Sequence, residues 1–88
     1  MSFEDKILFG DDSAAIYNYL LIHPEKIDII QSRTTPLITA CANRRNDVVD
    51  ILINLGANVN YQDSYRQTPL HFAVRIGDIN IISALLSA

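Results

Sequence analysis

The feature that most constrains this chain is a six-residue segment that occurs twice. Residues 68–73 read Thr-Pro-Leu-His-Phe-Ala, and residues 35–40, which lie 33 positions earlier, read Thr-Pro-Leu-Ile-Thr-Ala. A segment that returns at a fixed offset of about 33 residues is typical of helical solenoids, in which one supersecondary unit is stacked several times. The rest of the chain can therefore be compared with itself at the same offset.

The two copies match well beyond the hexamer. The apolar pairs Val48-Val49 and Leu52-Ile53 correspond to Ile81-Ile82 and Leu85-Leu86. Apolar pairs that lie four residues apart form one face of an α-helix. Each unit is thus predicted to contain a short helix after Thr-Pro, a break, and a second helix with an apolar stripe.

Local start and stop signals give the expected helix ends. Thr35 and Thr68 stand at N-cap positions, each followed by a proline that suits the first helical position. Asp78 is a further N-cap, and Gly56 is placed to end a helix in the left-handed conformation. The predicted helices are 36–43, 47–55, 69–76 and 79–87, and the polar connection 58–67 is predicted to be a turn.

These residues resemble the ankyrin repeat. The hexamer at 68–73, Gly77-Asp78, the apolar pairs and the sequence Gly-Ala-Asn-Val-Asn at 56–60 occur in the order and spacing of that family. The resemblance is specific over residues 35–88. It implies an all-α solenoid of three stacked helix-turn-helix units, each introduced by a finger-like β-turn, and a protein–protein interaction module that acts as a scaffold or adaptor.

The resemblance divides residues 1–88, as a single domain, into three repeats. Residues 31–63 form the second repeat and residues 64–88 the third, while residues 1–30 are expected to be a degenerate N-terminal cap repeat. Its helices are predicted over 3–9 and 13–22, with Asp11-Asp12-Ser13 capping the latter. Terminal repeats of a solenoid are expected to be atypical, because one of their faces meets water.

The third repeat lacks a C-terminal cap. Its outgoing face is expected to expose some of the apolar residues Val74, Ile76, Ile79, Ile82 and Leu86. Two interpretations stay open, since such a patch is seldom left bare. The chain is the N-terminal part of a longer array, which we favour, or the face packs against another molecule, as in a homo-oligomer. A targeting module for an enzymatic or effector domain on a missing segment is a further alternative.

Charge and composition exclude several partners. The net charge is −3 and the pI is near 5.0, whereas binding to nucleic acid or anionic lipid needs a basic surface. No apolar run approaches the roughly 20 residues that span a membrane. The single cysteine, Cys41, fits a reducing compartment. We therefore expect a cytoplasmic protein, with the nucleus or a host cytosol as other intracellular possibilities.

The sequence contains no motif that predicts catalysis, metal binding or cofactor binding. Cys41 is expected to be buried, His23 to face solvent, and His71, by the resemblance, to bond to the neighbouring turn backbone and tie repeats together. Ile38 replaces that histidine in the second repeat. The two histidines and one cysteine lack metal-ligand spacing, and no phosphate-binding loop is present. We predict no enzyme, no cofactor and no metal.

The resemblance places the partner-binding surface on the finger tips and the inner first helices. The candidate protein-binding residues are Arg33, Thr34, Asn43, Ser64, Tyr65, Arg66, Gln67, Arg75 and Ile76, and Ser32 and Ala42 lie on the same predicted surface. The alternative is that each of them is a solvated loop residue. Tyr65-Arg66 combines two residue types that are enriched in interface hot spots.

The arginines suggest the chemistry of a partner. Five of the seven basic residues map to the finger tips or to the exits of the first helices, namely Arg33, Arg44, Arg45, Arg66 and Arg75. A locally basic inner side would favour a protein partner with an acidic segment. Arg33, Arg44 and Arg66 stand where the family often has glycine, so a left-handed backbone there would carry a cost. A cation at a helix end, as at Arg44, also suits the helix dipole without any partner.

Overall fold

The computed structural model describes residues 12–30 and 33–88. Its elements are α2 (Ser13–Ile22), the 3₁₀-helix η1 (Pro24–Lys26), α3 (Pro36–Ala42), α4 (Asn46–Asn54), α5 (Pro69–Ile76) and α6 (Ile79–Ser87). Within these residues every regular element is helical, and the predicted all-α fold class is confirmed. The helix predicted over 3–9 lies outside the described residues.

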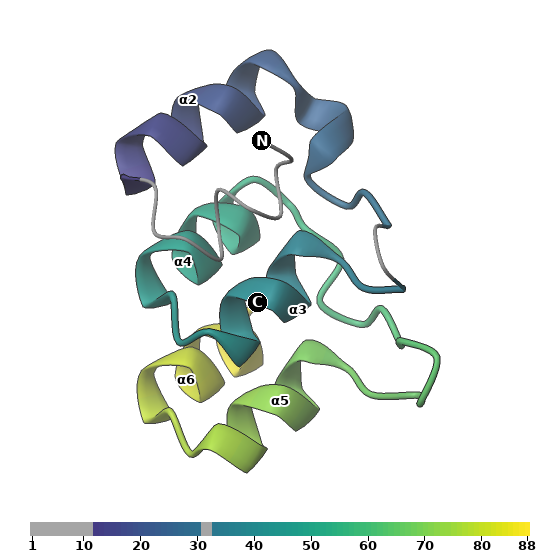
Figure 1. Ribbon diagram of the computed structural model, residues 1–88. Helices are drawn as coiled ribbons and strands as arrows, with labels where there is room; N and C mark the ends of the chain where they lie inside the picture. Colours follow the sequence, from purple (N-terminus) through teal and green to yellow (C-terminus); the bar gives the residue numbers. More distant parts are fainter. Residues whose placement is uncertain (1–11, 31–32) are drawn as a thin grey trace.

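The helices stack in two layers (Figure 1). One layer contains α2, α4 and α6, in which α4 contacts both of the others, and the second layer contains α3 against α5. Within each unit α3 packs against α4, and α5 packs against α6. Equivalent helices, which are 33 residues apart in the sequence, therefore lie next to each other in the stack, as expected for a solenoid.

The predicted caps are confirmed. The Thr35 and Thr68 hydroxyls accept from the backbone N–H groups of Ile38 and His71, over 3.5 Å and 3.4 Å. Asp12 and Asp78 cap α2 and α6 in the same manner. Gly56 and Gly77 have positive φ angles of 88° and 79°, which glycine adopts without strain. All the predicted helix ends in the described residues agree with the structure to within one residue.

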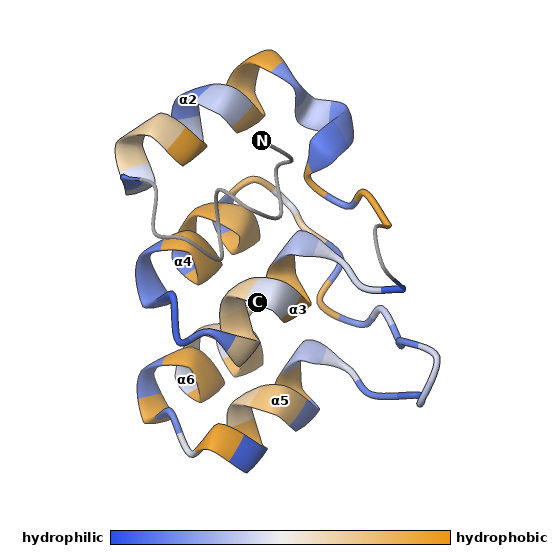
Figure 2. Ribbon diagram, in the orientation of Figure 1, coloured by the Kyte–Doolittle hydropathy of each residue, from blue (hydrophilic) through white to orange (hydrophobic). Residues whose placement is uncertain are grey.

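The core is concentrated around α3 and α4. Residues 36–41 of α3 are all buried, and in α4 the buried side chains are Val48, Val49 and Leu52. Figure 2, which is coloured by hydropathy, shows hydrophobic segments in α3, α4, α5 and α6 and a largely hydrophilic 58–67 connection. Cys41 is buried, as predicted, and burial, together with the nearby Asp78 carboxylate, raises the pKa of its thiol to about 12. The thiol is therefore structural rather than reactive.

The face of α5 and α6 that points away from α3 and α4 carries exposed apolar side chains. Val74, Ile79 and Leu86 are 59%, 75% and 68% exposed, and Ile76 and Ile82 are half-buried. The prediction that this face exposes some of the five is confirmed. We refer to Val74, Ile79 and Leu86 below as the end face.

Polar contacts between neighbouring units do not follow the expectation for His71. Its Nδ1 accepts from Thr68 N over 2.9 Å, within its own unit, and completes a capping box. This is the turn-backbone bond that was expected, but in the described residues its hydrogen bonds form no tie between repeats, so that part of the prediction is wrong. Ile38, at the same position one unit earlier, is 3% exposed and packs instead of bonding.

Among the described residues, three polar contacts link the helix pairs of neighbouring units. Asp28 accepts from Asn58 N over 2.8 Å, and the Arg44 guanidinium donates to Ile76 O over 3.5 Å. The Asn46 amide, assigned with its nitrogen toward α6, donates to the Asp78 carboxylate over 3.0 Å. Each contact joins one unit to the next one only.

Candidate functional site

The candidate site is a groove of about 370 Å³ between α3 and the 58–67 finger, which we call the finger groove. Its lining residues are Arg33, Thr34, Ile38, Thr39, Ala42, Asn43, Asp63, Ser64, Tyr65 and Phe72. One wall therefore comes from the start and inner face of α3 and the other from the finger tip, and Phe72 of α5 completes the lining. Because two consecutive units supply the walls, the groove exists only in the stacked chain.

The groove brings together five of the nine predicted binding residues. These are Arg33, Thr34, Asn43, Ser64 and Tyr65. The other four, Arg66, Gln67, Arg75 and Ile76, lie outside its lining. Three of the four are one unit further along, at the positions equivalent to Arg33, Thr34 and Asn43. The predicted set therefore comprises the groove and the corresponding positions on the next unit.

Arg75 lies beside the groove rather than in it. Its guanidinium carbon is 5.4 Å from the centroid of the Phe72 ring, within the range of a cation–π contact. The ring thus presents one part of its surface to the groove and another to the arginine. This contact holds a positive charge near the groove without placing it inside.

Five lining residues were not among the nine predicted binding residues, although one of them, Ala42, had been placed on the same surface. Ile38 and Thr39 share an inner face of α3 with Ala42 and Asn43, because residues three to four positions apart lie on one side of a helix. Helical spacing from Asn43 would have found them. Asp63 and Phe72 give no such signal, since they enter the groove only through the way in which α5 and its finger stack on α3.

Asp63 builds the finger tip. Its Oδ1 accepts from the backbone N–H groups of Tyr65 and Gln67, each over 2.8 Å, and its own backbone pairs with Gln67 O and with Arg66 N. An aspartate that bonds to the backbone two residues later is a common way of fixing a tight turn. The turn holds the Tyr65 side chain outward, and 82% of this residue is exposed.

The opposite wall is also held in place. The Asn43 amide donates to Thr39 O over 2.7 Å, which fixes the last turn of α3. The hydroxyl oxygen of Thr34 is buried, and within residues 12–30 and 33–88 it has no hydrogen-bond partner. A buried hydroxyl without a partner is unfavourable, because it has lost its bonds to water.

Three arginines have a left-handed backbone, as the sequence suggested. The φ angles of Arg33, Arg44 and Arg66 are 64°, 56° and 61°. This conformation costs an L-residue roughly 1–2 kcal/mol, and glycine would avoid the cost. Arg33 and Arg66 are exposed and lie at equivalent finger positions, 33 residues apart.

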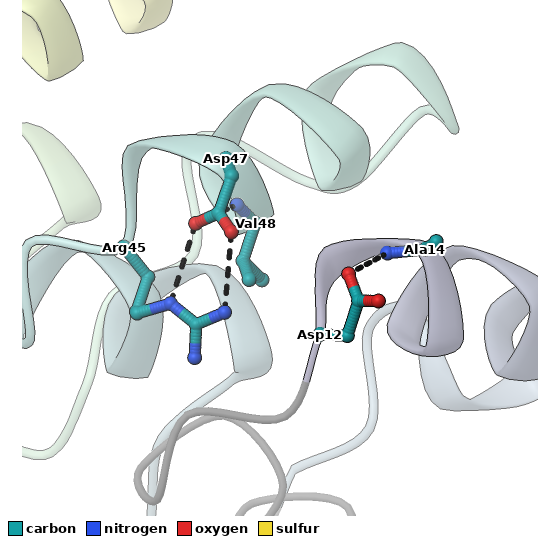
Figure 3. A network of polar contacts seen from close by, with 5 residues as sticks. All are labelled: Asp12, Ala14, Arg45, Asp47 and Val48. Carbon is teal, nitrogen blue, oxygen red and sulfur yellow. Dashed lines mark hydrogen bonds and ion pairs between the residues drawn. The ribbon is translucent and has the colours of Figure 1, made fainter.

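The structure assigns two of the five arginines to scaffold contacts. Arg45 binds both carboxylate oxygens of Asp47, over 3.3 Å and 3.2 Å (Figure 3). The hydrogen bond from Arg45 is the main cause of the lowered pKa of Asp47. Arg44 contacts Ile76 O, as described above. Arg33, Arg66 and Arg75 are the three that lie at or beside the finger groove.

The described residues contain no group of three or more His, Cys, Asp or Glu side chains that could hold a metal ion. The His23 ring lies 4.7 Å from the Tyr19 ring, tilted by 43°, and its Nδ1 is 3.3 Å from the Glu25 carboxylate. The His23 side chain is 44% exposed, in keeping with its expected place near solvent. Within the described part of the chain, no helix is long and apolar enough to cross a membrane.

Comparison with known proteins gives consistent matches. The family model described as "Ankyrin repeats (3 copies)" matches residues 7–88. The chicken nuclear factor NF-kappa-B p105 subunit is 39% identical over 69 residues, which are 78% of this chain and 7% of that protein. Mouse ankyrin repeat and SOCS box protein 11 is 43% identical over 51 residues, or 58% of this chain and 16% of that protein.

A third relative, the mouse RelA-associated inhibitor, is 44% identical over 52 residues, which are 59% of this chain and 6% of that protein. The chain thus spans less than a fifth of the length of these relatives. The match to the family model covers the stacked helix pairs, and that model describes three copies of the repeat. The chain belongs to the ankyrin repeat family, whose repeats are protein–protein interaction modules.

Proposed function

We propose that this chain is an intracellular, non-enzymatic adaptor module that binds an acidic segment of a partner protein through the finger groove and the adjacent finger tips. The binding residues are Arg33, Thr34, Asn43, Ser64, Tyr65, Arg66, Gln67, Arg75 and Ile76. The three arginines of this set supply positive charge on a chain whose net charge is −3. The relatives are themselves ankyrin repeat proteins, which supports recognition of another protein as the general activity.

The observation that carries the proposal is the coincidence of charge, an exposed aromatic ring and a groove at one place. Tyr65 is 82% exposed, beside a groove of about 370 Å³, and Arg33 and Arg66 occupy strained positions where glycine would be more stable. Tyrosine and arginine are enriched among the residues that dominate binding energy. A surface with no partner would gain stability from glycine at both arginine positions.

Affinity capture from a lysate, followed by mass spectrometry, tests the proposal. The double substitution Arg66→Glu and Arg75→Glu reverses two of the three charges near the groove. We expect it to remove captured acidic partners, and the capture by the unaltered chain to weaken as salt is raised, because exposed charge pairs are screened. Unchanged capture without salt dependence would contradict the proposal.

A matched pair of variants separates local charge from net charge. Arg66→Gln with Arg75→Gln lowers the net charge by two, and Asn18→Asp with Ser83→Asp, at exposed positions of α2 and α6, lowers it by the same amount. Only the arginine pair should reduce capture by about tenfold, in line with charged hot-spot residues. Equal losses from both pairs would assign the effect to net charge alone.

The end face favours a second candidate, self-association. In the stack, the equivalents of Val74 and Ile79 are Cys41 and Asn46, and these are covered by or bonded to the following unit. The end face therefore repeats the positions of an existing interface but leaves them exposed. We propose a homo-oligomer formed through this face as the alternative function.

Light scattering over a range of protein concentrations tests this alternative. A mass that rises with concentration and returns to that of a monomer with Ile79→Asn and Leu86→Lys would support it. Ile79→Asn copies the residue present at position 46, so the change should be tolerated by α6. A monomer at every concentration would exclude it.

A further inference from the structure

We infer that the finger groove is a socket for one bulky apolar side chain of an extended peptide, and that an acidic residue next to this anchor is bound at the Arg33 rim. The inference rests on the proposed function, which it deepens by specifying the order of residues in the partner. It differs from recognition of a uniformly acidic segment, because an acidic residue is excluded from the groove itself.

The size of the groove fits a single anchor. Its volume of about 370 Å³ lies at the lower end of the range of roughly 300–1,000 Å³ for ligand sites. One large side chain and the backbone on either side of it would fill this space. A helix presenting several side chains would need a longer groove.

Ile38 and Phe72 supply apolar surface in the lining of the groove. Ile38 is 3% exposed and Phe72 packs against the core, so neither side chain has to be ordered when a ligand binds. Tyr65, which is 82% exposed, would be covered by the ligand. Burying an apolar side chain against such surfaces supplies most of the affinity of a short peptide, at about 25 cal/mol per Å². The occupant of the groove is therefore a residue such as leucine or phenylalanine.

Polar groups in the groove match the backbone of an extended peptide. The buried Thr34 hydroxyl has no partner among the described residues, and the Asn43 amide is held by Thr39 O. The backbone hydrogen bonds that Asp63 accepts through its side chain use Oδ1. An extended segment carries one N–H and one C=O group per residue, which can bond to such groups on either side of the anchor. A bond from the ligand to Thr34 would relieve a cost that the unbound chain carries.

The charged side chains at the groove determine where the acidic residue of the peptide lies. Asp63 lines the groove, so a carboxylate placed inside would face another carboxylate at close range, which is unfavourable. Arg33 lines the groove from the opposite segment and Arg75 lies beyond Phe72. The acid must therefore flank the anchor on the arginine side. Binding of an acidic residue by Arg33 would also explain why an arginine occupies this strained backbone position.

A peptide array tests the residue order. The 88-residue chain is probed with four families of nine-residue peptides that contain a leucine or phenylalanine next to acidic residues, acidic residues alone, an apolar residue alone, or an apolar residue next to lysine. Affinities are then measured by fluorescence polarisation. We expect the first family to bind best, and replacement of its anchor by alanine to weaken binding by at least about tenfold.

Two variants locate the binding in the groove. Ala42→Trp, at an exposed position of α3 that lines the groove, should block the anchor and abolish binding, whereas Ala15→Trp, the same exchange at an exposed position of α2, should leave it unchanged. Thr34→Val keeps the shape and removes the hydroxyl. It should weaken binding by about tenfold while leaving unchanged or raising the melting temperature of the unbound chain. Circular dichroism spectra show whether each variant is folded.

The outcomes separate the inference from the proposed function. Binding of acidic peptides with or without an anchor, and insensitive to Ala42→Trp, would overturn the socket and leave the acidic-partner proposal standing. Anchor-dependent binding that survives replacement of the acids would overturn the order of residues. If no peptide of any family binds, the inference fails, and capture with the arginine variants decides the proposed function separately.

Discussion

The α3–α4 pair and the α5–α6 pair follow the same template, yet they differ in what covers them. Six consecutive residues of α3 are buried, whereas only Pro69 and Ala73 are buried in α5. One pair of equivalent positions shows the contrast, since Cys41 is 0% exposed and Val74 is 59% exposed. Among the described residues α5 and α6 pack against α3 and α4, and no further helix packs in the same way against α5 and α6, so burial here follows stacking more than the apolar pattern of a helix.

The polar positions differ in a related way. Where the α3–α4 pair has Arg44 and Asn46, which contact the next unit, the α5–α6 pair has Gly77 and Ile79. The inner pair thus uses polar side chains to hold its neighbour, and the outer pair presents an apolar side chain at the same place. Equivalent substitutions in the two pairs should therefore have unequal effects.

The largest difference is expected for the leucines that follow Thr-Pro. Leu37→Ala removes a fully buried side chain and should lower the free energy of unfolding by about 3 kcal/mol. Leu70→Ala, at the half-buried equivalent, should cost about 1 kcal/mol. Urea titrations followed by circular dichroism measure both. Equal costs would show that the two pairs are packed alike.

The next difference concerns thiol reactivity. Burial raises the pKa of Cys41 to about 12, so the folded chain contains very little reactive thiolate at pH 8. In a chain with Cys41→Ala and Val74→Cys, the thiol lies at an exposed position. It should be alkylated at least about a hundredfold faster than Cys41, which reacts only after local opening. Mass spectrometry after timed quenching measures both rates, and comparable rates would show that α3 opens freely onto solvent.

Substitutions at Gly77 and Arg44, which both have a left-handed backbone, should change the stability of the chain in opposite directions. Gly77→Ala forces a side chain into a φ of 79°, although no atom would obstruct the added carbon, and should cost about 1 kcal/mol. Arg44→Gly relieves strain at a φ of 56° but loses the contact to Ile76 O. A net gain of less than about 1 kcal/mol is expected. Thermal melts detect both changes, and a loss with Arg44→Gly would show that the contact outweighs the strain.

The smallest effect is expected at the start of α4. The pKa of Asp47 is lowered from 3.8, mainly by the hydrogen bond from Arg45, so its stabilisation is present above pH 4 and is lost as the pH falls through the lowered value. Asp47 is largely exposed, so Asp47→Asn should cost no more than about 0.5 kcal/mol at pH 7. Melting temperatures of the two chains should converge below pH 4. A constant difference from pH 7 to pH 3 would contradict the role of the ion pair.

The features that could be predicted from the sequence depend on a few neighbouring residues. Thr35, Thr68 and Asp78 cap helices because a side-chain oxygen needs only the N–H groups two or three positions later. The left-handed backbone of Arg33, Arg44 and Arg66 was expected from the resemblance alone, because the ankyrin repeat often has glycine at these positions. These local rules placed the ends of the five predicted α-helices in the described residues to within one residue, whereas the short 3₁₀-helix Pro24–Lys26 was not predicted.

Features that depend on stacking could be predicted only in part. Arg45 was placed on the basic surface with the other arginines, but a carboxylate two residues later binds it. His71 was expected to reach another repeat and bonds within its own. Asp63 and Phe72 were missed because no spacing in either unit shows that they meet Asn43. The finger groove as a binding site stays a prediction, and half of its lining residues belong to the predicted set.

The position of the finger groove across two units has a consequence for the mechanics of the chain. A ligand that contacts both α3 and the 58–67 finger would act as a clamp between neighbouring units, and its binding energy would add to the energy that holds them together. Amide hydrogens of α5 and α6, at the end of the stack, would then exchange more slowly on binding, including those far from the ligand. Binding of a ligand in one groove would therefore make the whole stack more resistant to unfolding unit by unit.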